Sequence, residues 1–542
     1  MPNLKTCRCR LGTSKVNPGK LVAALAVSMW CLACQAYAVT VVVNVNTQTF
    51  APLAAGFSGY NSPQLRNGVE YYDPKFIQAA AQVKPGWLRF PAGTGSLAYD
   101  WDPMDSSGDH IDVAWMNSLI TGNPPAVSGQ AATILTISQQ LTQAKGGVLF
   151  SDFTTFAKTL SARAIVCFNS YTDTNPGSAG RMARAAQIGG LNVAEWELAN
   201  EAYLYPAIFP SPAAYPAAMH DPYFIDIKSV TPNATVGLFL AGLFRGTRAV
   251  TLPPNWLAAW DQGMAAYTPR YWNAVSMHVY PLVTIQSDQN TIDVLNGVLA
   301  HGTGEYISSY VDPLAGSSTP IFITEFNCCS PQGNKFLSFL YNGIFLAEYV
   351  ARMSTVPNMK AVGVNSLYTD NSDYHGMIQS VDDHESYLLT QLAQNPSYST
   401  NTATNPQTQF QFYTSAPGLA LAVANQAING SNGTWPTTVT GGPFVPIHGY
   451  DGKPIPAIYA QGYQASDGSH YVVLTNKSSS TCSTTIQING VHVSGAMKVT
   501  TVSNSSGLVG NTAQSPNTVQ IQTTVAANPI SLGPYSVTTV NW

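Results

Sequence analysis

The segment AEWELANEAY, residues 194–203, joins a strand-like apolar run to three glutamates and an asparagine. Charged residues make up only 10% of the 542-residue chain, so this concentration of carboxyl groups needs a reason. In a parallel barrel, the carboxyl ends of the strands face the loops that form the active site. A strand that ends in Asn200 and Glu201 is therefore a candidate site element, and the runs on either side of it in the chain indicate the fold.

Eight strand-like runs follow one another between about residues 51 and 427. They are AAGFSGYN (54–61), GWLRFPAG (86–93), RAIVCFNS (163–170), EWELANE (195–201), TVGLFLAG (235–242), AVSMHVYP (274–281), PIFITEFN (320–327) and AVGVNSLYTD (361–370). Most are continuous apolar runs, which is typical of parallel strands with both faces buried. Helix-like stretches at 73–83, 153–164 and 336–354 lie between them, and Asp73 followed by Pro74 gives the first an N-cap and an N1 proline. This alternation predicts an α/β fold, a (β/α)8 TIM barrel.

The pattern of the sequence changes at about residue 429. HYVVLTNKS (470–478), STTIQINGVHVSG (483–495) and MKVTTVSN (497–504) alternate like antiparallel strands of a β-sandwich. The early segment VTVVVNVNT (39–47) has the same character, and we expect it to pair into that sandwich. The predicted organisation is a signal peptide over 1–38, an N-terminal sandwich strand over 39–50, a catalytic barrel over 51–427 and a C-terminal sandwich over 428–542.

The first 38 residues have the three parts of a secretory signal. Five basic residues precede or border the apolar run LVAALAVSMWCLAC, and AYA ends at Ala38, where we expect cleavage. The apolar run is too short for a typical membrane span. We therefore predict an extracellular or periplasmic protein, with lipoprotein acylation at Cys34 as the second reading.

Cleavage after Ala38 removes five basic and no acidic residues, so the net charge falls from −4 to −9. A surface this acidic repels nucleic acid, anionic lipid and long sulfated polysaccharides. Four cysteines remain, and adjacent Cys328 and Cys329 lack the spacing of a zinc site, which leaves a disulfide or buried thiols. The sequence contains no Gly-rich phosphate loop and does not fix the oligomeric state.

Two of the eight runs place a glutamate at or near their carboxyl end. Glu201 closes the fourth run and Glu325 lies near the end of the seventh, so the two face each other across one barrel mouth. A single glutamate at a strand end is more often a solvated or salt-bridged residue, but a facing pair is what retaining glycoside hydrolysis requires. Such a reaction needs no metal or organic cofactor.

ELANEAY together with ITEFN resembles the clan A glycoside hydrolases. Within that clan, GWLRFPAGTGSLAYDW, SMHVY and a sandwich built from both chain ends resemble glycoside hydrolase family 79, the β-glucuronidase and heparanase group. The resemblance covers most of the mature chain. It implies that Glu201 is the acid/base and Glu325 the nucleophile, with Asn200 bonding the sugar 2-hydroxyl and Arg89 and Tyr280 donating to Glu325.

Other residues of the site have two readings each. We expect Glu197 to be a buried structural partner, with Arg89 as the candidate, and Glu195 to be structural or exposed. His278 either touches a sugar hydroxyl or is a neutral core histidine bonded to a backbone carbonyl. The aromatic residues near the strands serve as sugar platforms or as packing: Tyr60, Trp87, Trp101, Tyr203 and Tyr368.

The resemblance implies a uronic acid, whose carboxylate is bound by backbone amides after the nucleophile and by a tyrosine after strand eight. Tyr374 matches that tyrosine by position, whereas NCCSPQG after Glu325 lacks the glycine pair of heparanases. The absence of a basic cluster near the strand ends favours removal of one terminal glucuronic acid from a glycan or glycoconjugate over endo-cleavage of a sulfated chain. The alternatives are a neutral sugar (xylose, arabinose or glucose) or a non-catalytic carbohydrate-binding protein on the same scaffold.

Overall fold

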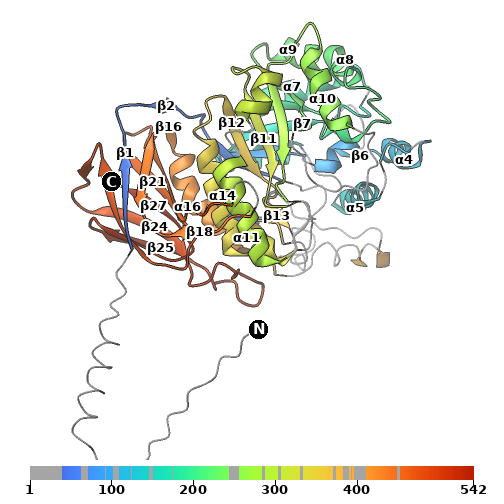
Figure 1. Ribbon diagram of the computed structural model, residues 1–542. Coiled ribbons are helices and arrows are strands. Elements are labelled where there is room, and N and C mark those ends of the chain that lie inside the picture. The colour runs from blue at the N-terminus through green and yellow to red at the C-terminus, as the bar shows by residue number, and fades with distance from the viewer. Residues whose placement is uncertain are drawn as a thin grey trace, which may run out of the picture.

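A computed structural model gives the arrangement of the chain (Figure 1). It describes residues 39–62, 71–91, 93–101, 109–123, 125–127, 129–145, 150–173, 175–242, 255–282, 287–302, 307–329, 334–369, 374–381, 390–391, 393–395, 411–448 and 452–542. The predicted signal peptide, with Ala38 and Cys34, lies outside these residues. None of the described helices is long and apolar enough to cross a bilayer.

Eight parallel strands close into a barrel, and they follow the eight predicted runs in order. They are β3 (Ser58–Asn61), β4 (Trp87–Phe90), β7 (Arg163–Phe168), β8 (Val193–Leu198), β9 (Val236–Phe239), β10 (Ala274–Val279), β11 (Ile321–Phe326) and β12 (Met359–Val364). Strand β12 pairs with β3 and closes the ring, with Val362 beside Ser58. The predicted (β/α)8 barrel is therefore confirmed.

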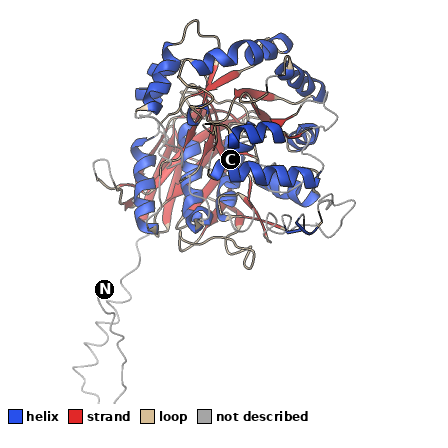
Figure 2. Ribbon diagram, turned by 90° about the vertical axis from the view of Figure 1, so that its right-hand side faces the viewer, coloured by secondary structure: helices blue, strands red, loops and turns tan. Residues whose placement is uncertain are grey.

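Helices surround the barrel strands (Figure 2). Helix α3 (Pro74–Gln82) begins as predicted, because the Asp73 carboxylate accepts the backbone N–H groups of Lys75 and Phe76. The other helices of the barrel region are α4 (Val113–Thr121), α5 (Gln130–Lys145), α6 (Phe150–Thr159), α7 (Ser178–Gly189), α8 (Ala214–Met219), α9 (Asp226–Val230), α10 (Trp256–Ala266), α11 (Asp288–Gly297), α13 (Asp312–Ala315), α14 (Leu340–Met353) and α16 (Ala416–Ile428). The stretch predicted at 336–354 divides into the 3-10 turn η6 (Lys335–Ser338) and α14.

Short elements complete the barrel region. They are the 3-10 helices η1 (Gly93–Leu97) and η2 (Ala202–Leu204), the π-helical segments η3 (His220–Ile225), η4 (Val298–Gly302) and η5 (Ile307–Val311), and the strands β5 (Tyr99–Asp100), β6 (His110–Ile111), β13 (Tyr368–Thr369), β14 (Ile378–Ser380) and β15 (Phe412–Thr414). Inside the barrel the Trp87 indole packs against Gly59 of β3 and Gly363 of β12. It fills the space that a Cβ atom at either position would need. Glycine at these two positions therefore makes space for the large side chain at the base of the barrel.

The C-terminal region is a sandwich of two sheets. One has the order β17-β1-β22-β23, with β26 also on β22, and the other has the order β2-β16-β20-β21-β27-β24-β25. Their strands are β1 (Val39–Val45), β2 (Ala51–Pro52), β16 (Ser431–Trp435), β17 (Thr437–Gly441), β20 (Ile458–Ala465), β21 (His470–Asn476), β22 (Cys482–Ile488), β23 (Val491–His492), β24 (Met497–Ser503), β25 (Ile521–Ala526), β26 (Ile530–Leu532) and β27 (Ser536–Asn541). The pair β18 (Phe444–Val445) and β19 (Ile455–Pro456) lies apart. Because β1 pairs with both β17 and β22, the N-terminal strand joins the sandwich as predicted.

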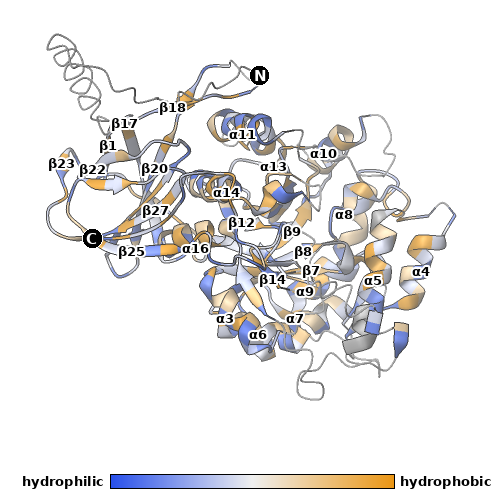
Figure 3. Ribbon diagram, turned by 90° about the horizontal axis from the view of Figure 1, so that it is seen from below, coloured by the Kyte–Doolittle hydropathy of each residue, from blue (hydrophilic) through white to orange (hydrophobic). Residues whose placement is uncertain are grey.

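The middle of the seven-stranded sheet is buried on both faces. Val472 and Leu474 of β21 point into the sandwich core, whereas Val473 between them joins the core that the barrel helices share. Helices α14 and α16 lie between this sheet and the barrel (Figure 1), and the sandwich and the barrel helices occupy opposite sides of the view in Figure 3. A buried ion pair joins the two parts, with Lys477 Nζ 2.5 Å from Glu348 Oε2.

The four cysteines that follow residue 38 are buried free thiols. The Sγ atoms of Cys328 and Cys329 are 3.6 Å apart, which is too far for a disulfide bond. Of the two readings of the sequence, the disulfide is therefore wrong and the buried thiols are confirmed.

Candidate active site

Glu201 and Glu325 come together at the carboxyl ends of the barrel strands. Glu325 is the fifth residue of β11, and Glu201 lies three residues beyond β8. Both side chains are buried, with residue exposures of 1% and 3%. The barrel thus brings together two carboxyls that are 124 positions apart in the sequence.

The expectation that Glu201 closes its strand is wrong. Strand β8 ends at Leu198 because Ala199 and Glu201 adopt the left-handed conformation, with φ of 69° and 52°. The Tyr171 hydroxyl donates to the Asn200 carbonyl within this turn. Non-glycine residues rarely occupy that region, so the turn that presents Asn200 and Glu201 carries local strain.

His278, the fifth residue of β10, lies between the two carboxyls. Its Nδ1 is 2.9 Å from Glu201 Oε1 and 3.6 Å from Glu325 Oε2. Those two oxygens are therefore no farther apart than 2.9 plus 3.6 Å, which is 6.5 Å. The ring nitrogen contacts carboxylates instead of the backbone carbonyl that the core reading of His278 expected. Contact with a sugar hydroxyl stays a prediction.

Four side chains donate to the Glu325 carboxylate. Oε1 lies 2.8 Å from Arg89 Nη1 and 2.9 Å from Asn61 Nδ2. Oε2 accepts from the Tyr280 hydroxyl at 2.8 Å and lies 3.4 Å from Asn365 Nδ2. Burial and the Glu325 charge raise the pKa of Tyr280 well above its usual value, so its hydroxyl keeps the proton that it donates.

Arg89 joins the catalytic layer to the layer beneath it. Its Nε donates to Glu197 Oε1 at 2.9 Å and its Nη2 to Asn200 Oδ1 at 2.8 Å. Burial disfavours its charge, but Glu197 and Glu325 outweigh that cost and raise the pKa of Arg89 well above its usual value. Glu197 is fully buried and is the structural partner of Arg89 that the sequence predicts.

Glu195 is a second buried carboxyl inside the barrel, so the reading that leaves it exposed is excluded. Its Oε1 accepts the Ser276 hydroxyl at 2.7 Å, and Gly237 leaves the room that this carboxyl occupies. Burial, with the charge of Glu197, raises its pKa well above the usual value for glutamate. We therefore assign Glu195 a structural role in the packing of the barrel interior.

Tyr374 is half-buried and packs against the barrel core. Among the described contacts none joins Tyr374 to Glu201 or Glu325. Residues 330–333 and 370–373, in the segments that follow strands β11 and β12, lie outside the described part.

The aromatic candidates have different contacts. Tyr203 donates to Glu201 Oε1 at 3.2 Å, whereas Tyr60 and Trp87 donate to the backbone carbonyls of Val83 and Phe57 as buried packing residues.

Sequence reasoning missed Asn61 and Asn365. Asn61 ends β3 and Asn365 follows β12, so both stand at strand ends, where polar residues were sought for the other strands. A search of every strand end for amides as well as carboxyls would have found them.

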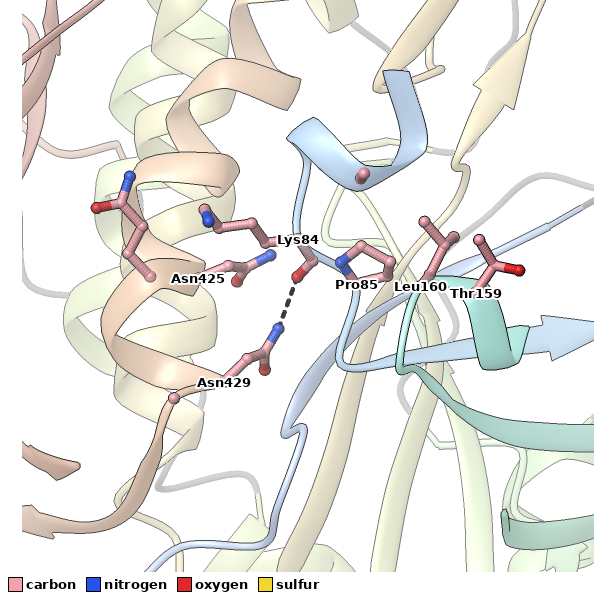
Figure 4. Close-up of a pocket in the computed structure, with 9 residues that line it drawn as sticks. Lys84, Pro85, Thr159, Leu160, Asn425 and Asn429 are labelled. Atoms are coloured by element: carbon pink, nitrogen blue, oxygen red, sulfur yellow. Dashed lines mark hydrogen bonds between the residues drawn. The ribbon is translucent and has the colours of Figure 1, made fainter. Parts of the chain in front are cut away.

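The opposite end of the barrel holds a polar pocket of about 390 Å³ (Figure 4). Lys84, Pro85 and Leu160, which precede strands β4 and β7, line it together with Asn425 and Asn429. The Asn429 amide donates to the carbonyl oxygens of Lys84 and Ser58 at 2.9 and 3.0 Å. These bonds tie α16 to the base of the barrel, where structural roles are usual.

No protein-family model matches the chain, and no curated protein sequence matches it. Solved structures do match. A GH51 α-L-arabinofuranosidase from Thermotoga petrophila RKU-1 is 15% identical over 93% of this chain and 100% of its own, with a TM-score of 0.62. The GH51 arabinofuranosidase from Xanthomonas axonopodis pv. citri is 12% identical over 93% and 99%, with a TM-score of 0.61.

A 4-O-α-L-rhamnosyl-β-D-glucuronidase from Fusarium oxysporum 12S is 15% identical over 92% of this chain and 100% of its own, with a TM-score of 0.51. At these identities the likeness concerns the fold. The chain therefore shares with these glycosidases a closed eight-stranded parallel barrel joined to a β-sandwich.

Proposed function

We propose that the protein is a retaining O-glycoside hydrolase. The observation that supports this most directly is the approach of Glu201 Oε1 and Glu325 Oε2 to within 6.5 Å, the sum of their 2.9 and 3.6 Å distances to His278 Nδ1. Retaining enzymes hold their two carboxyls about 5–5.5 Å apart, whereas inverting enzymes need roughly 6.5–9.5 Å to admit a water molecule. For this pair of oxygens, the bound leaves only the lower limit of the inverting range, and that supports retention.

In this proposal Glu325 is the nucleophile. Its carboxylate attacks the anomeric carbon while Glu201 transfers a proton to the leaving oxygen, which breaks the glycosidic bond and forms a glycosyl ester on Glu325. Glu201, now ionised, then removes a proton from water, and the resulting oxygen attacks the same carbon and releases Glu325. Four donors around Glu325 stabilise the anion that must attack and then leave.

We further propose that the enzyme removes one sugar from a chain end, and that this sugar is β-D-glucuronic acid. The deep burial of both carboxyls supports action at a chain end. The family 79 resemblance and the fold shared with a glucuronidase support the sugar. Tyr374 is the proposed donor to the uronate carboxylate.

A neutral sugar is the second candidate, and one observation favours it. Among the described Lys and Arg residues, only Arg89 pairs with the site glutamates, and Glu197 and Glu325 already neutralise it. Within the described part of the site, a substrate carboxylate would therefore meet neutral donors. The GH51 structures that share the fold are arabinofuranosidases, which makes an arabinofuranoside the neutral substrate to test first.

Hydrolysis of p-nitrophenyl β-D-glucuronide, β-D-xyloside, β-D-glucoside and α-L-arabinofuranoside decides between these sugars. We expect glucuronide turnover that is lost in Glu325→Gln and recovered by azide in Glu201→Ala, because azide needs no general base. Proton NMR of the first product should show the β-anomer. Turnover of a neutral glycoside alone would overturn the proposed sugar, and an α-anomer released first from a β-glycoside would overturn retention. A chain inactive on all four substrates would favour a carbohydrate-binding protein.

Secretion is part of the proposal as well. N-terminal sequencing of protein recovered outside the cytoplasm should begin at Val39, the residue after Ala38. A mature chain that begins at an acylated Cys34 would instead indicate a membrane-anchored lipoprotein and contradict cleavage after Ala38.

A further inference from the structure

Two asparagines stand beside the candidate nucleophile, and the roles above use neither of them. Asn61 is 2% exposed at the end of β3, and Asn365 is half-buried just beyond β12. Strands β3 and β12 are neighbours in the barrel, so the two amides meet on one side of Glu325. Asn61 Nδ2 lies 3.3 Å from Asn365 Oδ1.

These amides complete a ring of hydrogen bonds around Glu325. Arg89 Nη1 donates to Asn61 Oδ1 at 3.3 Å and to Glu325 at 2.8 Å. Asn365 Nδ2 donates to the Tyr280 hydroxyl oxygen at 2.8 Å, and that hydroxyl donates to Glu325 at 2.8 Å. The ring therefore runs from Arg89 through Asn61, Asn365 and Tyr280 to Glu325 and back.

The direction of every bond in the ring follows from Arg89. A guanidinium has donors only, so the oxygen of the Asn61 amide faces Arg89 and its NH₂ group faces Glu325 and Asn365. The oxygen of Asn365 must then face Asn61, which leaves its NH₂ group toward Tyr280. The Tyr280 oxygen accepts from Asn365, so its proton points to Glu325.

All four donors thus point at Glu325, and only an ionised carboxylate is acceptor-only. Protonating Glu325 would set an O–H group against this ring and break at least one bond. We infer that Asn61 and Asn365 are positioning residues that keep the Glu325 carboxyl ionised and fix its orientation, Asn61 directly and Asn365 through Tyr280. The link to catalysis rests on the proposed role of Glu325 as nucleophile.

Arg89, Tyr280 and His278 are the other titratable groups that lie against Glu325 in the described part of the site. Arg89 from β4 and Tyr280 beyond β10 donate to it, and His278 of β10 lies 3.6 Å from Oε2. Glu201 reaches the site through the same His278 Nδ1, and Glu197 acts on Arg89 from below. The variants of Asn61 and Asn365 retain all of these titratable groups, so a change in Glu325 titration reports on the lost amide and on the Arg89 and Tyr280 side chains that it bonds.

The test measures the titration of Glu325 directly, without substrate. Protein labelled with [δ-¹³C]glutamate is titrated by ¹³C NMR, and the resonance lost in Glu325→Gln identifies the nucleophile. We expect the Glu325 midpoint to rise in Asn61→Ala and to rise less in Asn365→Ala, since only Asn61 has a short bond to Glu325.

Asn358→Ala is the matched control. Asn358 immediately precedes the same strand, β12, at its other end, is 6% exposed, and donates to Asp312 and to the Thr319 carbonyl. Its variant loses two side-chain hydrogen bonds, against three for each ring asparagine, and we expect its Glu325 midpoint to equal that of the wild type. Asn61→Ser and Asn365→Ser serve if an alanine variant does not fold, because they keep a small polar group in the barrel.

The inference is overturned if the Glu325 titration midpoint stays at its wild-type value in variants at both positions. Native near-ultraviolet circular dichroism must show that these variants are folded. Activity gives the second readout: the acid limb of kcat/KM should move to higher pH in the same order, with kcat/KM lower by about tenfold or more. If the wild type cleaves no glycoside, the proposed function fails, but the titration still decides whether the amides hold Glu325 ionised.

Discussion

Glu197 and Glu325 share one guanidinium. Arg89 Nε lies 2.9 Å from Glu197 Oε1, and Arg89 Nη1 lies 2.8 Å from Glu325 Oε1. The first carboxyl is sealed inside the barrel with no exposed surface, while the second lies at the mouth. One cation therefore supports a structural carboxylate and a candidate catalytic one, and the two should respond differently to the same substitution.

Replacing Glu197 by Gln should cost stability more than chemistry. Removing one partner of a buried pair costs roughly 3–5 kcal/mol. Glu325→Gln also removes a partner of Arg89, but it should cost less, because Glu325 lies at the mouth and Arg89 keeps Glu197, and it should lower kcat by at least about 10⁴-fold. Thermal unfolding and steady-state kinetics on both variants provide the measurement. A Glu197→Gln protein that is stable but inactive would make Glu197 the catalytic residue.

Replacing Ala199 by Gly should relieve backbone strain. Ala199 has φ of 69°, a conformation that costs a residue with a Cβ about 1–2 kcal/mol and glycine very little. We expect the free energy of unfolding to stay level or rise. Ala194→Gly is the control, because Ala194 lies within β8, where glycine should cost about 1 kcal/mol. Equal losses at the two positions would show that the turn is not strained.

The buried pair of Lys477 and Glu348 should hold the sandwich against the barrel. The cations Lys477 and Arg352 outweigh the effect of burial and lower the pKa of Glu348, so this carboxylate is ionised. Lys477→Met should lower the unfolding free energy by about 3 kcal/mol, because it removes one partner of a fully buried pair.

The double variant Lys477→Met with Glu348→Met separates the pair from the packing around it. It should recover most of the loss, since no buried charge remains unpaired. Scanning calorimetry of the single and double variants measures both effects. Additive losses would show that the two side chains do not interact.

Asp261 should make stability fall as the pH rises toward neutrality. Its carboxylate accepts the N–H groups of Ala241 and Gly242 and the Tyr310 hydroxyl, but burial outweighs these bonds and raises its pKa to about 7. The folded protein then binds this proton more tightly than the unfolded chain, whose value is about 3.9. The stability gained is complete below about pH 4 and is lost as the pH rises through 7, by up to about 1.4 kcal/mol per unit.

Asp261→Asn should therefore flatten the dependence of the unfolding midpoint on pH between about 5 and 7.5. The control is Asp288→Asn, an exposed position at the start of α11. Differential scanning calorimetry across this range makes the comparison, and identical slopes in wild type and Asp261→Asn would contradict the assignment.

The sequence by itself determined the fold class. AIVCF (164–168) is apolar at every position, and IFITEF (321–326) is apolar at all but Thr324 and Glu325. Strands buried on both faces favour such runs, so the eight strands of the barrel were predictable in order. The alternating C-terminal segments indicated a two-faced sheet for the same reason. Glu201 and Glu325 were found because a carboxyl after an apolar run is rare and visible.

The tertiary structure decided how those residues meet. The positive φ of Ala199 and Glu201 ends the in-and-out alternation of side chains along β8. Glu201 therefore lies in a turn, three residues beyond the end of the strand. His278 lies between the two carboxyls only because β8, β10 and β11 belong to one closed ring. Asn61 and Asn365 are 304 positions apart, and ring closure between β3 and β12 alone brings their amides together. Such contacts depend on backbone geometry and long-range closure, which no local pattern of residues encodes.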